Sequence, residues 1–104
     1  MVDRLRAATL PLPHDALANH HADLVDLARH YGLRNVRVFG SAARHEDGPG
    51  SDVDLLVTRP DGMGLLTLAK FAEEAGELLG VAVDIVTDGG LPEDHEILRS
   101  AVAL

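Results

Sequence analysis

Apolar residues recur along this chain at two different spacings, which predict helices in some segments and strands in others. Over residues 14–31 they lie three and four positions apart, as on one face of a helix, and Gly32 can end that helix. The same spacing returns over residues 65–79, which Gly80 follows. Residues 1–13 have no clear period and contain two prolines, so we interpret them as an irregular lead-in.

Three short apolar segments rich in β-branched residues predict strands. Residues 36–39 and 53–57 are the first two, and residues 81–86 are the third. The link between the first two strands is too short for a helical crossover, so we expect them to be antiparallel. The helix at residues 65–79 permits a parallel crossover to the third strand. A last helix is expected to begin near residue 91 and to end near Ala101.

This order of elements predicts an α/β fold, with a small mixed β-sheet of about three strands flanked by helices. At 104 residues the chain is expected to form a single domain, residues 1–104, with one modest core. Aromatic residues make up only 3% of the chain, so Leu, Val and Ala must build that core. No apolar run approaches the ~20 residues of a membrane span, and we expect no membrane partner.

Charge and cysteine content narrow the classes of function. The formal net charge is −8, from 9 basic and 17 acidic residues, and such a surface repels phosphate backbones. We therefore expect no direct binding to nucleic acid, whereas a basic protein partner would suit this charge. The lack of cysteine excludes disulfide bonds and thiolate metal sites, and it fits a reducing compartment, so a cytoplasmic location is expected.

Two carboxylates stand at the start of the second predicted strand, and a third lies within the third strand. Side chains alternate along a strand, so Asp52 and Asp54 share one face while Val53 points into the core. Asp84 joins them if the second and third strands are neighbours. Three carboxylates this close repel one another unless cations lie between them, and hard oxygen ligands favour Mg²⁺ or Mn²⁺ over Zn²⁺. We predict that all three are catalytic and bind metal.

A Gly-Ser pair, Gly40-Ser41, breaks the chain after the first predicted strand, and Ser41 is expected to cap a short helical turn over residues 42–44. Glycine lets a phosphate approach the backbone, where the N–H groups of the next turn and the serine hydroxyl can bind it. A phosphate site beside divalent cations is suited to phosphoryl or nucleotidyl transfer. Taken singly, Gly-Ser is an ordinary turn, Asp-x-Asp a solvated pair, and Asp84 an edge-strand charge that discourages aggregation. Their combination at these spacings favours a functional site.

Residues 40–44, 51–57 and 83–86 together resemble the polymerase-β-like nucleotidyltransferase superfamily. More narrowly, they resemble the minimal nucleotidyltransferases (MNT) that serve as antitoxins beside HEPN-domain ribonuclease toxins. The resemblance covers nearly the whole chain. It implies that Asp52 and Asp54 bind two Mg²⁺ ions, for which Mn²⁺ could substitute.

The same resemblance implies roles for further residues. Asp84 would complete the metal site on the acceptor side and help to activate the attacking hydroxyl. Gly40 and Ser41 would hold the β- and γ-phosphates, and Ser51 belongs to the same nucleotide-binding set. Arg44 would also belong to this set by contacting phosphate, or it would pair with a carboxylate instead. The implied reaction is in-line attack by a tyrosine hydroxyl of a HEPN toxin on the α-phosphorus of ATP, with release of pyrophosphate. The AMPylated toxin would be silenced.

The sequence is compatible with more than one function and assembly. The family often has glycine after the motif arginine, and this chain has His45, which could reshape the entrance of the phosphate loop but removes no metal ligand. The chain could instead neutralise a toxin by direct binding, or transfer a nucleotide to a small hydroxylated acceptor such as an aminoglycoside. A homo-oligomer or a hetero-oligomer with the toxin is compatible with the sequence. The remaining histidines are interpreted as surface or half-buried helix positions: His14, His20, His21, His30 and His95.

Overall fold

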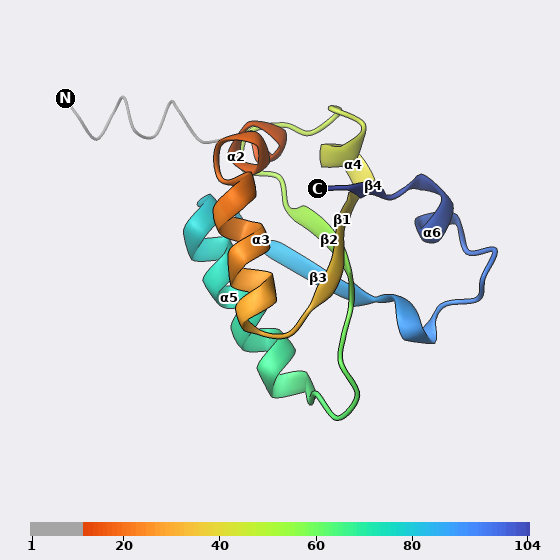
Figure 1. Ribbon diagram of the computed structural model, residues 1–104. Coiled ribbons are helices and arrows are strands. Elements are labelled where there is room, and N and C mark those ends of the chain that lie inside the picture. Colours follow the sequence, from red (N-terminus) through yellow and green to blue (C-terminus); the bar gives the residue numbers. More distant parts are fainter. Residues whose placement is uncertain (1–11) are drawn as a thin grey trace.

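Four strands form one sheet in the computed structural model, which describes residues 12–104 (Figure 1). They are β1 (Arg34–Phe39), β2 (Val53–Thr58), β3 (Val83–Thr87) and β4 (Val102–Ala103), in the spatial order β3-β2-β1-β4. β1 pairs antiparallel with β2 and with β4, whereas β2 and β3 run parallel. The predicted antiparallel first pair and parallel crossover are both confirmed.

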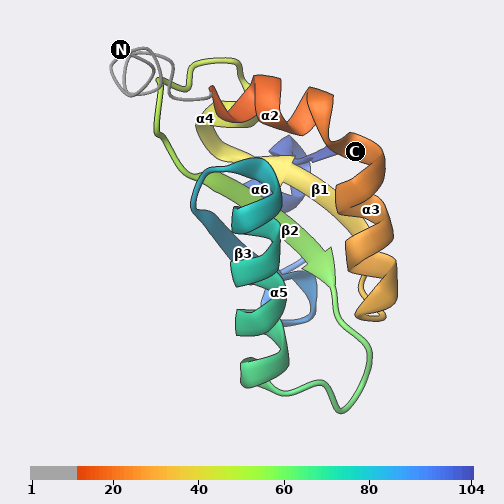
Figure 2. The same ribbon diagram turned by 90° about the vertical axis from the view of Figure 1, so that its left-hand side faces the viewer.

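Helices lie on both sides of this sheet. α3 and α5 pack on one side, and α6 lies on the other (Figures 1 and 2). The helical elements are α2 (Pro13–Asn19), α3 (His21–His30), α4 (Gly40–Ala43), α5 (Leu65–Leu79) and α6 (Glu96–Ser100), with a 3₁₀ turn η1 (Asp88–Gly90). Within residues 12–104, none of these helices is both long enough and apolar enough to cross a membrane. The predicted α/β fold is confirmed, and most of the expected lead-in lies outside the described residues.

The structure differs from the expected elements in the N-terminal helix, in the start of the last helix and in a fourth strand. The single helix expected over residues 14–31 is two helices that meet at His20, whose φ of −120° and ψ of 20° are not helical. The last helix begins only at Glu96, because the imidazole of His95 accepts a hydrogen bond from the N–H of Ile97 and so caps the helix there. β4 was not expected, because a two-residue strand is too short to show an alternating pattern.

The core lies between the sheet and the helices α3 and α5. Val53, Leu55 and Val57 alternate along β2, point to the helices and are fully buried in one cluster with Phe71 and Ala75 of α5. Burying one such side chain stabilises the fold by about 1.5–3 kcal/mol. The buried apolar residues of β2 therefore fix the position of Asp54, which lies between Val53 and Leu55, and of Asp52 just before the strand.

The buried stripe of α5 differs from the predicted one. It runs at spacings of three and four through Leu68, Phe71, Ala75 and Leu79, and Phe71 is its fully buried centre. Leu65 was expected on this stripe, but its side chain is 80% exposed in the first turn of the helix. The largest side chain of the helix thus sets which face turns to the sheet.

A polar network ties β1 and β2 to the turn η1 on the face opposite the core. The Arg37 guanidinium lies 2.7 Å from a carboxylate oxygen of Asp88, and Arg37 Nε donates to the carbonyl of Asn35. The Thr58 hydroxyl donates to the same Asp88 oxygen at 2.5 Å. This network fixes the chain that leaves β3, at the far end of the strands from the Gly-Ser turn.

Replacing Asp88 with Ala should lower the free energy of unfolding by about 1.5–3 kcal/mol, because Arg37 and Thr58 lose a charged acceptor. Burial alone would raise the pKa of Asp88, but the hydrogen bonds from Thr58 and Arg37 and the Arg37 charge outweigh it and hold that pKa below its usual value. The stability is therefore present above the unfolded pKa of about 3.9 and is lost as the pH falls through the lower folded value. Urea denaturation of both proteins at neutral and acidic pH measures this; a stability difference that does not shrink in acid would contradict it.

Candidate active site

The three predicted acidic ligands lie at one end of the sheet. Asp54 is the second residue of β2 and is half-buried, whereas Asp84 on β3 and Asp52 just before β2 are exposed. The parallel register pairs Asp54 directly with Asp84. β1 runs antiparallel to β2 and ends at the same place, where α4 begins (Figure 2). The strand pairing on which the predicted site depends is therefore present.

The surroundings of Asp54 disfavour the ionised form of its carboxyl group. Burial raises the pKa of Asp54, and the negative charges of Asp84 and Asp52 raise it further. In residues 12–104, however, no three His, Asp or Glu side chains lie close enough together to hold one metal ion. The backbone gathers the carboxylates while their side chains stay apart. A cation would have to draw them in, and the exposed Asp52 and Asp84 have room to rotate.

Gly40 makes direct contact with the central carboxylate of the site. Phe39 is the register partner of Asp54, so the next residue of the chain turns over its side chain. Gly40 has a φ of +75°, and a Cβ built on it would lie 2.3 Å from Asp54 Oδ2. Only glycine satisfies both the left-handed backbone and this close approach. The predicted phosphate-binding turn therefore lies directly against one of the predicted metal ligands.

The turn that contains Ser41 differs from the prediction in one detail. α4 begins at Gly40 with Phe39 as its N-cap, so Ser41 is not the cap, and no side chain caps this helix. The carbonyl of Ser41 accepts hydrogen bonds from the N–H groups of Glu46, at 2.9 Å, and Arg44, at 3.1 Å. These bonds close the turn tightly behind the Gly-Ser pair.

Arg44 and Ser51 occupy the loop that joins α4 to β2. Arg44 Nε lies 2.6 Å from a carboxylate oxygen of Glu46, in a pair so exposed that it contributes little to stability. The Ser51 hydroxyl accepts a hydrogen bond from the N–H of Gly48, and the Ser51 N–H donates to the Gly48 carbonyl, both at 3.1 Å. Ser51 therefore shapes the loop, and both residues stand between the phosphate turn and Asp52.

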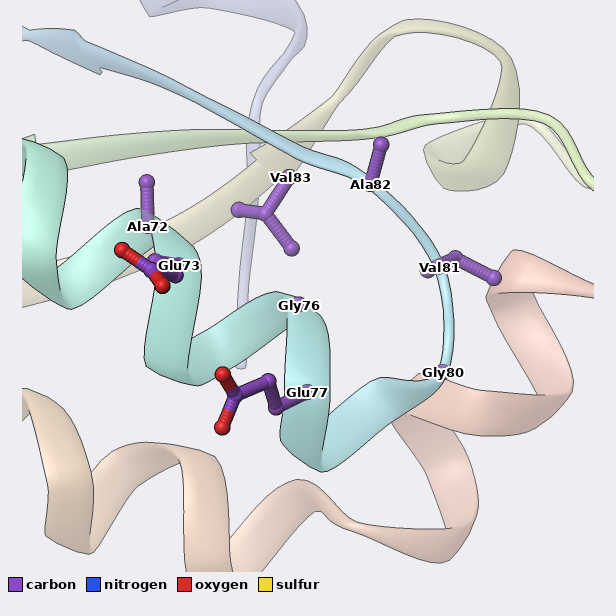
Figure 3. A pocket seen from close by; sticks show the side chains of 8 residues that line it. All are labelled: Ala72, Glu73, Gly76, Glu77, Gly80, Val81, Ala82 and Val83. Carbon is purple, nitrogen blue, oxygen red and sulfur yellow. The ribbon is translucent and has the colours of Figure 1, made fainter.

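A separate groove borders β3 on the helix side of the sheet. It is open, has a volume of about 480 Å³ and lies between the second half of α5 and the start of β3 (Figure 3). Ala72, Gly76 and Val83 contribute small or apolar walls, and the carboxylates of Glu73 and Glu77 stand at its rim. None of the predicted site residues lines this groove, because the side chain of Asp84 points to the opposite face from that of Val83.

The structure also shows contacts between α2 and the loop that joins α4 to β2, which the sequence did not indicate. His14 of α2, interpreted as an ordinary helix position, binds the side chain of Asp47 and stacks on His45. Asp47 is 33 residues away in the chain, and no periodic pattern relates it to α2. The only signal in the sequence was the unusual His45 after the motif arginine.

A mixed α/β sheet that places paired carboxylates against a glycine turn defines the class of nucleotidyltransferases. Comparison with known protein families agrees: the nucleotidyltransferase domain family matches residues 24–102, and the chain belongs to that family. The protein is therefore an enzyme of the nucleotidyl-transfer class, as the resemblance in its sequence implied.

Two relatives align with this chain over most of their own length. Protein adenylyltransferase MntA of Thermococcus cleftensis is 38% identical over 79 residues, which are 74% of this chain and 80% of the relative. A protein of Methanocaldococcus jannaschii, provisionally named a protein adenylyltransferase, is 32% identical over 79 residues, 76% of this chain and 82% of its own.

Two solved structures share the fold. One, provisionally described as a minimal nucleotidyltransferase, is 39% identical with a TM-score of 0.77, and the match covers 88% of this chain and 95% of that one. The other is a toxin–antitoxin with AMP-PNP, 19% identical with a TM-score of 0.68, covering 77% of this chain and 68% of that one. The predicted nucleotidyltransferase fold is thereby confirmed.

Proposed function

We propose that this protein is an antitoxin that transfers AMP from ATP, in a Mg²⁺-dependent reaction, to a tyrosine hydroxyl of a cognate HEPN ribonuclease toxin. One observation carries the proposal: Asp54 pairs in register with Asp84 and lies directly against Gly40. This contact supports a cation site and a phosphate site that adjoin one another. The names of the relatives, protein adenylyltransferases, and the toxin–antitoxin with AMP-PNP of similar fold support the choice of reaction and partner.

The donor set fits Mg²⁺. The predicted ligands Asp52, Asp54 and Asp84 offer only carboxylate oxygens. Oxygen ligands of this kind are the ones that Mg²⁺ prefers. Bound there, Mg²⁺ would neutralise the phosphates and the charge that develops on the leaving group. A positive ion beside Asp54 would offset the burial and the negative charges of Asp84 and Asp52 that raise its pKa.

The residues of this chain would then divide the work of the reaction. Gly40 and the N–H groups of the following turn would bind and orient the β- and γ-phosphates. Asp84, exposed on β3, would accept the proton of the tyrosine hydroxyl while the tyrosine oxygen forms a bond to the α-phosphorus. The bond from the α-phosphorus to the bridging oxygen breaks, and pyrophosphate leaves. The tyrosine carries the AMP.

Incubation with a HEPN toxin, ATP and Mg²⁺ should add the mass of AMP to the toxin, as measured by intact mass spectrometry. An Asp84→Asn variant and a reaction with EDTA serve as negative controls, and a toxin whose tyrosine is changed to Phe should gain no mass. Toxin that stays unmodified but is neutralised would favour direct binding. Turnover with a hydroxylated small molecule and no protein partner would favour the small-acceptor reading. Either result would overturn the proposal.

Binding of Mg²⁺ is expected to raise the melting temperature of the wild-type protein, because a bound ion stabilises only the folded state. The increase should be largely absent in Asp54→Asn, which loses the central carboxylate. Differential scanning calorimetry in MgCl₂ against EDTA gives the readout, and it requires neither toxin nor ATP. Equal increases in the two proteins would mean that these carboxylates do not form the cation site.

A further inference from the structure

The loop between α4 and β2 is fastened to α2 by one buried carboxylate. The side chain of Asp47 is fully buried, although its neighbours in the loop are mostly exposed. Asp47 Oδ2 accepts a hydrogen bond from the backbone N–H of His14 at 3.0 Å, and Asp47 Oδ1 lies 2.7 Å from His14 Nδ1. A buried carboxylate is costly unless both of its oxygens are bonded, and here both are.

His45, two residues before Asp47, has an unfavourable backbone conformation. Its φ is +55°, in the left-handed region that glycine occupies readily and a residue with a Cβ does not. The imidazole of His45 stacks on that of His14, with ring centroids 4.6 Å apart and planes inclined by 12°. One side chain, His14, therefore contacts both residues of the loop.

These three residues, which we name the loop clamp (His14, His45 and Asp47), act as one unit. His14 is bonded to Asp47 at its ring edge and packed on His45 with its ring face. The stack and the charged hydrogen bonds offset the strain that His45 introduces. Two residues of the clamp, His45 and Asp47, lie on the segment that joins the Gly-Ser turn to Asp52.

We propose that His14 and Asp47 are positioning residues for nucleotide binding: they hold His45 in its left-handed conformation and thereby fix the loop between the Gly-Ser turn and Asp52. This inference rests on the proposed function. The clamp touches none of the predicted ligands, so it acts through the loop and not on the substrate. Loss of the clamp should loosen the site before ATP arrives and should leave the chemical step intact once ATP is bound.

The strain argument predicts a specific pattern among variants. Removing the His14 ring should leave His45 strained and unsupported, so the loop would relax away from its position. Changing His45 to Gly removes the strain itself, so His14 would then matter much less. The effects of the two substitutions should therefore not add, which is the signature of direct coupling.

The experiment compares wild type with His14→Ala, His45→Gly and the double variant. His14→Ala should raise the KM for ATP by about tenfold with little change in kcat. Without the His14 ring the strained loop relaxes from its binding position, and ATP binding must restore that position. Hydrogen exchange of residues 44–51, measured without ligands, should speed up by a similar factor. His45→Gly alone should resemble wild type, and the double variant should recover most of the loss. Asp47→Asn, which keeps the side-chain shape, is included in case His14→Ala does not fold, and should shift both readouts in the same direction.

A double variant as impaired as His14→Ala would overturn the clamp, and so would a His14→Ala protein with unchanged KM and unchanged exchange. Wild-type protein that transfers no nucleotide to a HEPN toxin would instead overturn the proposed function. In that case the exchange measurements still decide whether the clamp holds the loop.

Discussion

Changing Asp54 to Asn should reduce nucleotidyl transfer on the order of 10³-fold, because metal-ion stabilisation of a phosphoryl transition state is worth several kcal/mol. Asp54 is the carboxylate most enclosed by the site: it pairs with Asp84, lies against Gly40 and is partly buried. Asn keeps the shape of the side chain, so the fold should survive. The loss of rate is measured as toxin modified per unit time at saturating ATP and Mg²⁺.

The same substitution should stabilise the protein when divalent cations are removed. Burial and the charges of Asp84 and Asp52 raise the pKa of Asp54, so the folded state prefers the neutral carboxyl. The neutral carboxyl of Asp54 therefore costs the folded state nothing below the unfolded pKa of about 3.9. As the pH rises through the higher folded pKa, the carboxyl ionises and the folded state of the wild type loses stability. Asn cannot ionise, so its advantage should appear only above that window.

Chemical denaturation in EDTA across this pH range measures the effect. Asp23→Asn makes the same change of charge at an exposed position of α3, and it should not alter the rate of transfer. An Asp54→Asn protein that is less stable than wild type at neutral pH would show that Asp54 has a structural role. One that retains transfer would remove Asp54 from the catalytic site.

The second large effect is expected for Gly40→Ala. The new Cβ would lie 2.3 Å from Asp54 Oδ2 and 3.3 Å from Asp54 Cγ, so the carboxylate must move. Displacement of a catalytic group by about 1 Å costs on the order of 10²-fold in rate. The left-handed backbone of Gly40 adds a loss of stability of about 1–2 kcal/mol.

Two other glycines separate these causes. Gly62 has a φ of +86° with nothing within 4 Å of its Cβ position, so Gly62→Ala should show the backbone cost alone and keep full activity. Gly48 lies in the loop beside the site at a φ that suits other residues, and its Cβ would meet only Ser51 Oγ, at 3.8 Å. Gly48→Ala should therefore be nearly neutral. Loss of transfer in Gly40→Ala no greater than in Gly62→Ala would rule out the steric contact as the cause.

Much of this arrangement could be predicted from the sequence because it depends on local patterns. The short link after Phe39 required an antiparallel pair, and the long amphipathic helix allowed a parallel crossover. Alternation along the strands then placed Asp54 and Asp84 on a common face. The contact between Gly40 and Asp54 followed from the same pairing, although its closeness became visible only in the structure.

The remaining features depend on contacts that leave no periodic trace. Asp47 and His14 are far apart in sequence, and each is an unremarkable polar residue in its own segment. The two-residue β4 and the break at His20 are too short to interrupt an apolar pattern visibly. The face of α5 was misjudged because Phe71 outweighs several smaller apolar residues in what it buries.

β3 lies at the border of the described sheet, which leaves Asp84 open on one flank. Within residues 12–104, β3 has β2 as its only neighbouring strand, so Asp84 is approached from the side without crossing other backbone. Asp54, by contrast, is enclosed between β1 and β3. If Asp84 activates a hydroxyl on the surface of a folded protein, as proposed, an open flank of this kind is what lets that surface approach. The edge position of β3 is thus compatible with a bulky acceptor.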